Sequence, residues 1–398
     1  MLILLFELIV GVPIFVLSCF LAVELIVGVI SYREFENTTT LPSNDSHNIK
    51  SAILIPAHNE EDTIGETLAQ LNSHKTENDV VVVVADNCTD NTRMICESFG
   101  VYVTERFNDV KKGKGYALQH GKDWVCENLD VDVVIIFDAD CFFTDDSLER
   151  LKKITYDRKQ VCQARYLMQS KHSSPKTLVP QFTWWVKNAI RAVGLKVLAR
   201  TAHIQGSGIA FPIDIFKGLE FASGSIVEDL ELGINLSLTG KPVHFCQEAQ
   251  VESYFPENQK GLDEQRNRWE HGHLATIIRV PAQLLNCVFR RDLRSFFLLL
   301  DAAVPPLISF FLLQATFCMV GTMLVVYWMQ GVLLSLSASS FLITFSTLFL
   351  VWFVRGKALI GLSDIPKMIK FLTSKFSVYS RLVSGRKASW DKTTRDKM

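Results

Sequence analysis

The chain has 398 residues, of which 48% are apolar and 21% are charged, and its formal net charge is -1. A charged share below the roughly 25% of average globular domains favours a membrane-associated protein, and the length fits two or three structural units of about 150 residues each. The near-zero net charge excludes a uniformly basic nucleic-acid-binding protein, and the composition excludes collagen, low-complexity disorder and a small disulfide-rich scaffold.

The first element expected is a transmembrane helix over residues 2–30. This run is apolar except for Glu7 and Glu24, and about 20 apolar residues are enough to span a bilayer. It is too long for the core of a signal peptide, and no small-residue cleavage site follows it. The sequence therefore predicts a helix that stays in the membrane.

Residues 50–255 are expected to form a soluble domain. Short apolar runs rich in β-branched residues, at 51–56, 80–85 and 133–137, alternate with amphipathic helical patterns such as 62–71. Uninterrupted apolar strands separated by helices are typical of a parallel sheet that is covered on both faces. The predicted fold class is α/β, with a mostly parallel sheet and helices on both faces. Ligands are expected at the carboxyl ends of the strands.

Three polar clusters follow predicted strands. They are Pro56-Ala-His-Asn59-Glu60, then Asp86 to Asp90, and then Asp138-Ala-Asp140. Asp and Asn residues at such positions also cap helices, and for Asp86 and Asp90 capping is an equal alternative. Asp138 and Asp140 differ, because two carboxylates at alternate positions after a buried strand repel each other unless a cation lies between them. Carboxylate oxygens suit Mg²⁺ or Mn²⁺, which also bind substrate phosphates.

The segment Lys111-Lys-Gly-Lys114-Gly is the candidate phosphate-binding element. It places three lysines and two glycines at a predicted helix start, where the helix dipole and the basic side chains favour an anion. A solvated basic turn explains this segment equally well by itself. Neither the G-x-G-x-x-G nor the Walker A pattern is present. Together these features favour a metal-assisted nucleotide-diphosphate site, with Lys114 among the donor-binding residues.

Two later segments carry further candidate site residues. Glu228 and Asp229 open a predicted helix, where the helix dipole alone already favours carboxylates. Farther on, Gln265, Arg268 and Trp269 fall on one face of a helix at positions i, i+3 and i+4. An Arg and an aromatic ring on one face can hold a phosphate and stack against a sugar or base. The same pair is also typical of a helix at the membrane interface.

The last membrane elements expected are two spans, over residues 302–329 and 332–354, joined by a tight turn. Residues 355–398 follow as a basic tail, which holds eleven of the 41 Lys and Arg residues and three of the 42 Asp and Glu residues, a local net charge of +8. The positive-inside rule places that tail in the cytoplasm. Three spans then put the N-terminus outside and the soluble domain inside, at the cell (inner or plasma) membrane. The nine cysteines include no C-x-x-C pair, which favours reduced thiols in a reducing compartment.

Taken in order, the motifs resemble those of the membrane-bound family-2 glycosyltransferases, the group that includes cellulose, hyaluronan and chitin synthases. The matching residues are Pro56-Ala-His-Asn-Glu60, Asp86, Asp138-Ala-Asp140, Glu228-Asp229 and Gln265-Arg-Asn-Arg268-Trp269, the last of which fits the family's Q-x-x-R-W pattern. The resemblance covers about residues 50–280 well and the membrane segments loosely. It implies a GT-A-like fold, in which residues 256–297 form the Q-x-x-R-W helix and an interfacial segment.

The resemblance also implies an activity and a set of residue roles. The family transfers a sugar from a nucleotide-diphosphate sugar, commonly a UDP-sugar, to a polysaccharide or lipid-linked acceptor with inversion. By position, the resemblance implies that Asp138 and Asp140 bind the metal and the diphosphate, and that Asp86 and residues 56–60 bind the nucleoside. It implies that Asp229 is the general base, with Glu228 as the next candidate. Arg268 and Trp269, beside Gln265, would close over the pyrophosphate and the acceptor.

Two alternatives stay open. A polyprenyl-phosphate sugar synthase moves one sugar to a lipid phosphate, but such enzymes usually lack Q-x-x-R-W. A non-catalytic membrane assembly subunit with a transferase-like domain is disfavoured by the intact Asp138, Asp140 and Asp229. The expected partners are a nucleotide-sugar donor, a lipid-linked or glycan acceptor and the lipid bilayer, and no nucleic acid. A second copy of the chain or other polysaccharide-assembly proteins are the candidate protein partners.

Overall fold

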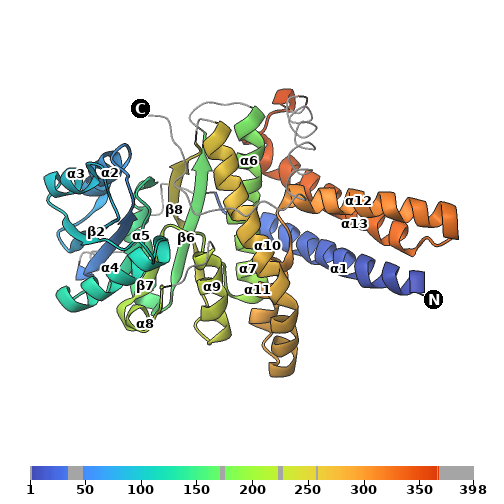
Figure 1. The fold of residues 1–398 in the computed structure, drawn as a ribbon, viewed down its shortest axis with the longest axis horizontal. Helices are drawn as coiled ribbons and strands as arrows, with labels where there is room; N and C mark the ends of the chain where they lie inside the picture. The colour runs from blue at the N-terminus through green and yellow to red at the C-terminus, as the bar shows by residue number, and fades with distance from the viewer. Residues whose placement is uncertain are drawn as a thin grey trace. The chain divides into compact units, whose positions relative to one another are not determined.

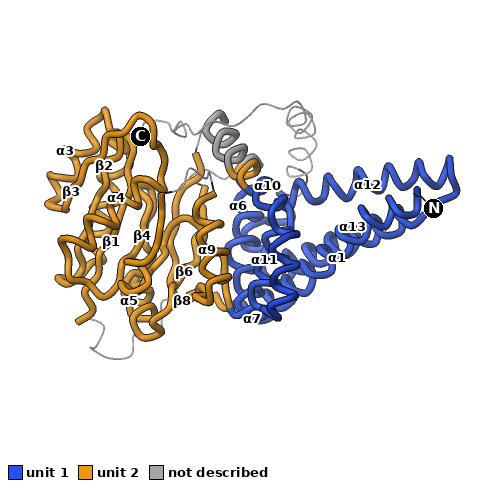
Figure 2. Tube along the Cα trace, turned by 60° about the horizontal axis from the view of Figure 1, so that its bottom comes forward, with its two compact units in different colours: residues 1–32, 178–200, 273–385 blue, residues 33–177, 201–272, 386–398 orange. Residues whose placement is uncertain are grey.

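The computed structural model describes residues 2–34, 48–170, 175–222, 227–256, 259–364 and 366, with only the backbone of 175–176 and 259–268. The chain divides into two compact units (Figure 2). Unit 1 comprises residues 1–32, 178–200 and 273–385, and unit 2 comprises residues 33–177, 201–272 and 386–398. Each unit therefore draws on segments that are far apart in the sequence.

Unit 2 is built on an eight-stranded sheet with the strand order β3-β2-β1-β4-β7-β6-β8-β5. One half consists of the parallel strands β1 (Ser51–Ala57), β2 (Asp79–Asp86), β3 (Tyr102–Arg106) and β4 (Val133–Ile136). The other half consists of β5 (Cys141–Phe143), β6 (Cys162–Gln169), β7 (Ile209–Pro212) and β8 (His244–Tyr254). In that half β7 is antiparallel to β4 and β6, and β5 is antiparallel to β8, whereas β6 is parallel to β8. The α/β class is confirmed, and the sheet is mixed rather than parallel throughout.

Helices cover both faces of this sheet (Figure 1). α4 (Lys114–Asn128) packs on β1 and β2, and α3 (Thr92–Ser98) packs on β2 and β3. α2 (Ile64–His74) packs on β5, α5 (Ser147–Arg158) packs on β8, and α8 (Ile213–Lys217) packs on β7 and β4. α9 (Glu228–Leu238) also belongs to the described part of unit 2. β4 is buried along its whole length, and β1 is buried except at Pro56. Burial on both faces explains why these strands are uninterrupted apolar runs.

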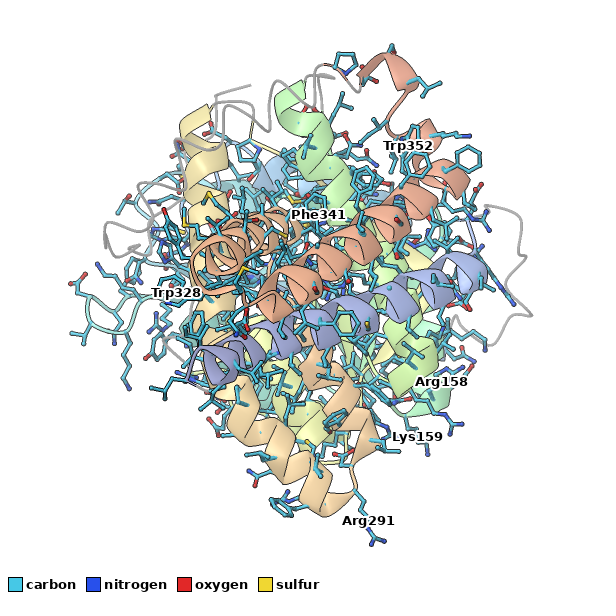
Figure 3. All side chains as sticks on the ribbon, turned by 90° about the vertical axis from the view of Figure 1, so that its right-hand side faces the viewer. Arg158, Lys159, Arg291, Trp328, Phe341 and Trp352 are labelled. Carbon is cyan, nitrogen blue, oxygen red and sulfur yellow. The ribbon has the colours of Figure 1, made fainter. Side chains whose placement is uncertain are left out.

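Among the described residues of unit 1, three helices are long and apolar enough to cross a membrane. They are α1 (Leu2–Ser31), α12 (Leu307–Trp328) and α13 (Val332–Val354). α12 begins directly after Pro306, so the Pro305-Pro306 pair precedes the helix and does not interrupt it. Residues 302–303, which were expected in the second span, end the preceding helix α11 (Leu293–Ala303). Trp328 and Trp352 lie toward opposite ends of the α12–α13 pair, with Phe341 between them (Figure 3).

Polar side chains join these three helices to one another. Gln314 Nε2 of α12 donates hydrogen bonds to Ser18 Oγ of α1 at 2.9 Å and to Thr344 Oγ1 of α13 at 3.0 Å. At the start of α13, the backbone N–H of Leu333 donates to Glu7 Oε1 of α1 at 3.3 Å. Polar side chains buried among apolar helices act as specific cross-links, because hydrocarbon offers them no other partner.

A buried ionic cluster lies beside the membrane helices of unit 1. It involves the helical segment between β6 and β7 in the chain, made of α6 (Pro175–Trp185), the π-helix η2 (Val186–Arg191) and α7 (Ala192–Ala199). Arg191 Nε donates to Glu24 Oε2 of α1 at 3.0 Å, and its Nη2 pairs with Asp301 of α11. Glu24 is wholly buried, so its carboxyl group finds its partner in Arg191 and not in water.

Candidate active site

The polar residues predicted at strand ends meet where the strand order of the sheet reverses. β1 lies between β2 and β4, because the chain passes from β1 outward to β2 and β3 and then crosses back to β4. In open α/β sheets, ligands bind at the carboxyl ends of the strands at such a reversal. Asp138 follows β4, residues 58–60 follow β1, and Asp86 ends β2. The topology thus brings all three predicted clusters to one edge of the sheet.

Two residues in the loop after β1, Asn59 and Glu60, form hydrogen bonds with the loop that follows β2. Asn59 has a φ of 55°, and its Oδ1 accepts a hydrogen bond from the backbone N–H of Thr89 at 2.7 Å. Glu60 donates its backbone N–H to Thr92 Oγ1 at 2.8 Å. Pro56 is half-buried near the end of β1. Asn59 and Glu60 therefore hold the shape of this edge through their local contacts.

Asp86 is paired with an arginine and does not cap a helix. Arg106 Nη1, at the end of β3, lies 2.5 Å from Asp86 Oδ1, and Asp86 is only 3% exposed. Arg106 Nη2 also donates to the backbone carbonyl of Lys111 at 2.5 Å. Asp90, in contrast, accepts the backbone N–H of Thr92 at 3.0 Å, at the first residue of α3. Asp90 thus holds the turn before α3, where Asn91 is the N-cap residue, whereas Asp86 forms a buried charged pair at the strand end.

Lys114, the first residue of α4, reaches into the carboxylates that follow β4. Its Nζ lies 2.5 Å from Asp138 Oδ1 and 2.8 Å from the backbone carbonyl oxygen of Gly206. Asp138 is also held by its backbone N–H, which donates to Ser207 Oγ at 3.0 Å. Lys114 is therefore a half-buried member of the site and not part of a solvated basic turn.

Asp138, Asp140 and Cys141 offer ligand atoms that all lie within 4.8 Å of one another. Burial raises the pKa of the Cys141 thiol well above its ordinary value, and the carboxylates of Asp140 and Asp138 raise it further. Because the thiol stays protonated, the ligand atoms on offer are carboxylate oxygens. Oxygen ligands of this kind fit Mg²⁺ or Mn²⁺ better than a metal that prefers thiolates.

Glu228 and Asp229 form the first turn of α9 and lie beside the same cluster. A Cβ placed on Gly206 would lie 3.4 Å from Asp229 Oδ2, and the Gly206 carbonyl is the one that binds Lys114. Burial raises the pKa of Glu228 to about 7, and the charge of Asp229 raises it as well, whereas Lys114 lowers it. Glu228 therefore changes protonation state near neutral pH.

The carboxylates of the site outnumber the positive charge that Lys114 supplies. Burial lowers the pKa of Lys114, but Asp138, Glu228 and Asp229 outweigh burial and leave that pKa above its ordinary value. The ammonium group therefore stays charged. Burial also raises the pKa of Asp138, which Lys114 opposes and Asp140 reinforces. This excess of negative charge favours a further cation at Asp138 and Asp140.

Gln265, Arg268 and Trp269 lie on one continuous helix, α10 (Gln259–Arg290), as their spacing predicts. The side chains of Gln265 and Arg268 lie outside the described residues, and Trp269 is half-buried. One turn later, Gly272 approaches Val227, the residue that precedes Glu228. The start of α9 and the residues that follow Trp269 on α10 are thus in direct contact.

Residues 52–217 match the family described as Glycosyl transferase family 2. This stretch of the chain is similar to the family 2 glycosyl transferases. The stretch that matches holds Asp86, Lys114 and Asp138, so the predicted resemblance is confirmed for this part of the chain. Glu228, Asp229 and α10 follow it in the sequence.

The glycosyltransferase domain also has a similar curated relative. The Probable glycosyltransferase YdaM of Bacillus subtilis (strain 168) is 27% identical to this chain over 287 residues, which are 66% of this chain and 63% of YdaM. The chain thus spans less than two thirds of the length of the curated relatives it matches.

Solved glycosyltransferase structures resemble the chain at low identity. The mannosyltransferase PcManGT from Pyrobaculum calidifontis, in complex with GDP-Man and Mn²⁺, is 14% identical with a TM-score of 0.42, over 84% of this chain and 99% of PcManGT. S. aureus TarS, in complex with UDP-GlcNAc, is 12% identical with a TM-score of 0.39, over 81% of this chain and 79% of TarS. Both TM-scores are below 0.5, so the chemistry of the site is inferred from the residues of this chain and not from these structures.

Proposed function

We propose that this chain transfers a sugar from a nucleotide-diphosphate sugar, specifically a UDP-sugar, to a glycan or lipid-linked acceptor with inversion at the anomeric carbon. The observation that carries the proposal is the cluster of Lys114, Asp138, Asp140, Glu228 and Asp229 at the reversal of strand order. It combines a cation for a diphosphate, oxygen ligands for a metal and a carboxylate that can act as a base.

The Asp86–Arg106 pair is proposed to bind the nucleobase. A buried carboxylate accepts a ring N–H, and an adjacent guanidinium donates to a ring carbonyl. Uracil and guanine both present a ring N–H next to a carbonyl group, whereas adenine and cytosine present no such ring N–H to a carboxylate. The pair therefore supports a uridine or guanosine donor, and the family resemblance favours uridine.

Asp138 and Asp140 are proposed to hold Mg²⁺ or Mn²⁺. Such an ion, when bound, neutralises charge on the donor diphosphate. Lys114 supplies a second, permanent positive charge beside Asp138, at a helix start that already favours anions. Arg268, Trp269 and Gln265 are proposed to close over the diphosphate and the acceptor from α10.

Asp229 is proposed as the general base. As the acceptor hydroxyl attacks C1 of the sugar, its proton passes to the carboxylate while the bond from C1 to the diphosphate oxygen breaks. A single displacement without a covalent intermediate inverts the configuration at C1. Glu228, with a pKa of about 7, is the next candidate, because a general base works well with a pKa near the operating pH. The family resemblance places Asp229 first.

The reaction is proposed to take place at the cytoplasmic face of the cell membrane. α1, α12 and α13 support this location by their length and composition. The second half of α10 adds support, because it exposes an apolar stripe made of Leu274, Ile278, Leu285, Val288 and Phe289. Arg279 and Arg290 are exposed on other sides of the same helix, and such a combination is typical of helices that lie on anionic membranes.

A donor screen with the purified full-length chain tests the proposed function. Radiolabelled UDP-, GDP- and ADP-sugars are supplied in turn, and release of the nucleotide diphosphate is measured with and without excess chelator. We expect turnover of a UDP-sugar, its loss in chelator and its return with Mg²⁺ or Mn²⁺. Asp140→Asn should lose turnover, whereas Asp130→Asn, at a side chain that is 97% exposed, should keep it. Full turnover in chelator would refute the metal, and no turnover of any sugar nucleotide would favour an assembly subunit.

A further inference from the structure

We propose that Gly272 of α10 is a positioning residue, whose lack of a side chain sets the spacing between α10 and the carboxylates at the start of α9. A Cβ placed on Gly272 would lie 2.3 Å from Val227 Cγ1 and 3.3 Å from Val227 Cβ. Gly272 is buried, and real carbon atoms do not approach to 2.3 Å. A side chain at this position must therefore displace α10 or the Val227 side chain, which is short and β-branched and has little freedom to turn away.

Val227 is directly linked to the candidate base. It is the residue before Glu228 and Asp229, and its carbonyl oxygen accepts the backbone N–H of Glu231 at 3.1 Å. That hydrogen bond makes Val227 part of the first turn of α9. A shift of Val227 is consequently a shift of the two carboxylates that follow it.

Close packing of α9 against residues 204–206 limits the room for such a shift. A Cβ on Gly233 would lie 3.0 Å from the backbone nitrogen of Ile204, and a Cβ on Gly206 would lie 3.4 Å from Asp229 Oδ2. The start of α9 is thus held between α10 on one side and residues 204–206 on the other. Because Gly206 also binds Lys114 through its carbonyl, movement of α9 would disturb the Lys114–Asp138 pair as well.

A glycine inside a long helix needs an explanation of this kind. α10 has 32 residues, and glycine is a poorer helix former than alanine in a helix interior. Close approach of another element is a common reason for a glycine in such a place. Gly272 follows Trp269 by three residues, on the same face of the helix. The contact therefore fixes the helix that bears Gln265, Arg268 and Trp269 against the start of α9. Its effect on catalysis rests on the proposed function.

The test is Gly272→Ala in the full-length chain, compared with two matched variants. Gly65→Ala is the control, because Gly65 also lies in a helix of unit 2 but a Cβ there would have its nearest neighbour, Ile95 Cγ2, at an ordinary 3.6 Å. Gly272→Ala combined with Val227→Ala is the rescue variant, because it removes the methyl group that the new Cβ meets. Rates of transfer, donor KM and thermal unfolding are measured for each variant.

We expect Gly272→Ala to lower kcat about 10- to 100-fold, the size of effect that a misplacement near 1 Å produces, with little change in donor KM or thermal unfolding. The rescue variant should recover most of the rate, and Gly65→Ala should behave as wild type. Wild-type kcat in Gly272→Ala would overturn the proposal. So would a rescue variant that regains the fold without regaining the rate, because Gly272 would then serve stability alone.

A structural readout separates this proposal from the proposed function. A structure of Gly272→Ala should show α10 displaced from Val227, which can be measured even if the wild-type chain turns over no sugar nucleotide. In that case the proposed function fails and the positioning contact stands. An unchanged distance between α9 and α10 in Gly272→Ala would overturn the contact itself.

Discussion

The Nζ atom of Lys114 lies 2.5 Å from Oδ1 of Asp138, at the strand end where a metal and a diphosphate are proposed to bind. The two side chains are 23% and 26% exposed, so the pair is largely screened from water. Lys114 therefore does two things without any ligand present. It compensates the half-buried charge of Asp138, and it keeps a positive charge at the place where the leaving diphosphate gains negative charge.

Replacing Lys114 tests this double role. Lys114→Met keeps most of the side-chain volume but removes the charge, so we expect kcat for transfer to fall about 10²-fold, the usual effect of losing one group that stabilises developing charge. Lys112→Met is the matched control, because Lys112 lies two residues away and is 54% exposed. Steady-state kinetics of the two variants measure the effect. Equal rates for both variants would remove Lys114 from the site.

Substitutions that keep the side-chain size but remove the charge distinguish whether Asp229 or Glu228 is the general base. Asp229→Asn should lower transfer by about 10²–10⁴-fold, which is the usual contribution of a general base. Donor affinity should barely change, since the donor contacts are proposed at Asp86, Asp138 and Lys114. Glu228→Gln should cost much less. If Glu228→Gln loses the activity and Asp229→Asn keeps it, the base is Glu228.

Glu228 should also give the stability of the protein a pH dependence that its amide variant lacks. Its pKa is raised from 4.5 to about 7 in the folded protein, so the folded protein holds this proton more tightly than the unfolded chain. The resulting stabilisation is fully present below pH 4.5 and is lost as the pH rises through 7. We expect the melting temperature of the wild type, relative to Glu228→Gln, to fall across this interval without added donor or metal. A constant difference between the two proteins would show that Glu228 titrates normally.

Arg191 should be a major contributor to the stability of unit 1. Arg191→Ala leaves the carboxylates of Glu24 and Asp301 without their partner, and breaking a buried ion pair in this way costs about 3–5 kcal/mol. Thermal unfolding of the detergent-solubilised chain measures the loss. Lys196→Ala, a change of a basic residue in the adjacent α7, provides the comparison and should shift unfolding far less. Similar melting temperatures for both variants would show that the cluster is not a source of stability.

The strand ends could be predicted from the sequence because they depend on local patterns. β1, β2 and β4 are apolar runs buried on both faces, and their carboxyl ends must meet where the strand order reverses. β3 was missed, since it lies at the sheet edge, is only partly buried and mixes polar with apolar residues. Arg106 ends that strand, so it was missed with it. The antiparallel strands were missed because pairing of β7 with β4 depends on contacts between distant residues.

The partners of the predicted residues could not be read from the sequence for the same reason. Lys114 and Asp138 are 24 residues apart, and Lys114 and Gly206 are 92 apart. The motifs in the sequence predict which residues belong to the site. Which partner each residue has depends on how the sheet places α4 and residues 204–208. The contact between Gly272 and Val227 is equally invisible in the sequence, since a glycine in a helix shows no periodic signal.

The hydrogen bonds that join the three apolar helices have a consequence for synthesis of the chain. Ser18 and Gln314 are 296 residues apart, and Glu7 and Leu333 are 326 apart. At about 5–20 residues per second, the ribosome needs roughly 15–60 s to make the intervening chain. If α1 enters the bilayer as it emerges, Glu7 and Ser18 wait that long for their partners. Slowing translation between the first helix and the hairpin should therefore prolong the stage at which α1 is most easily lost from the membrane.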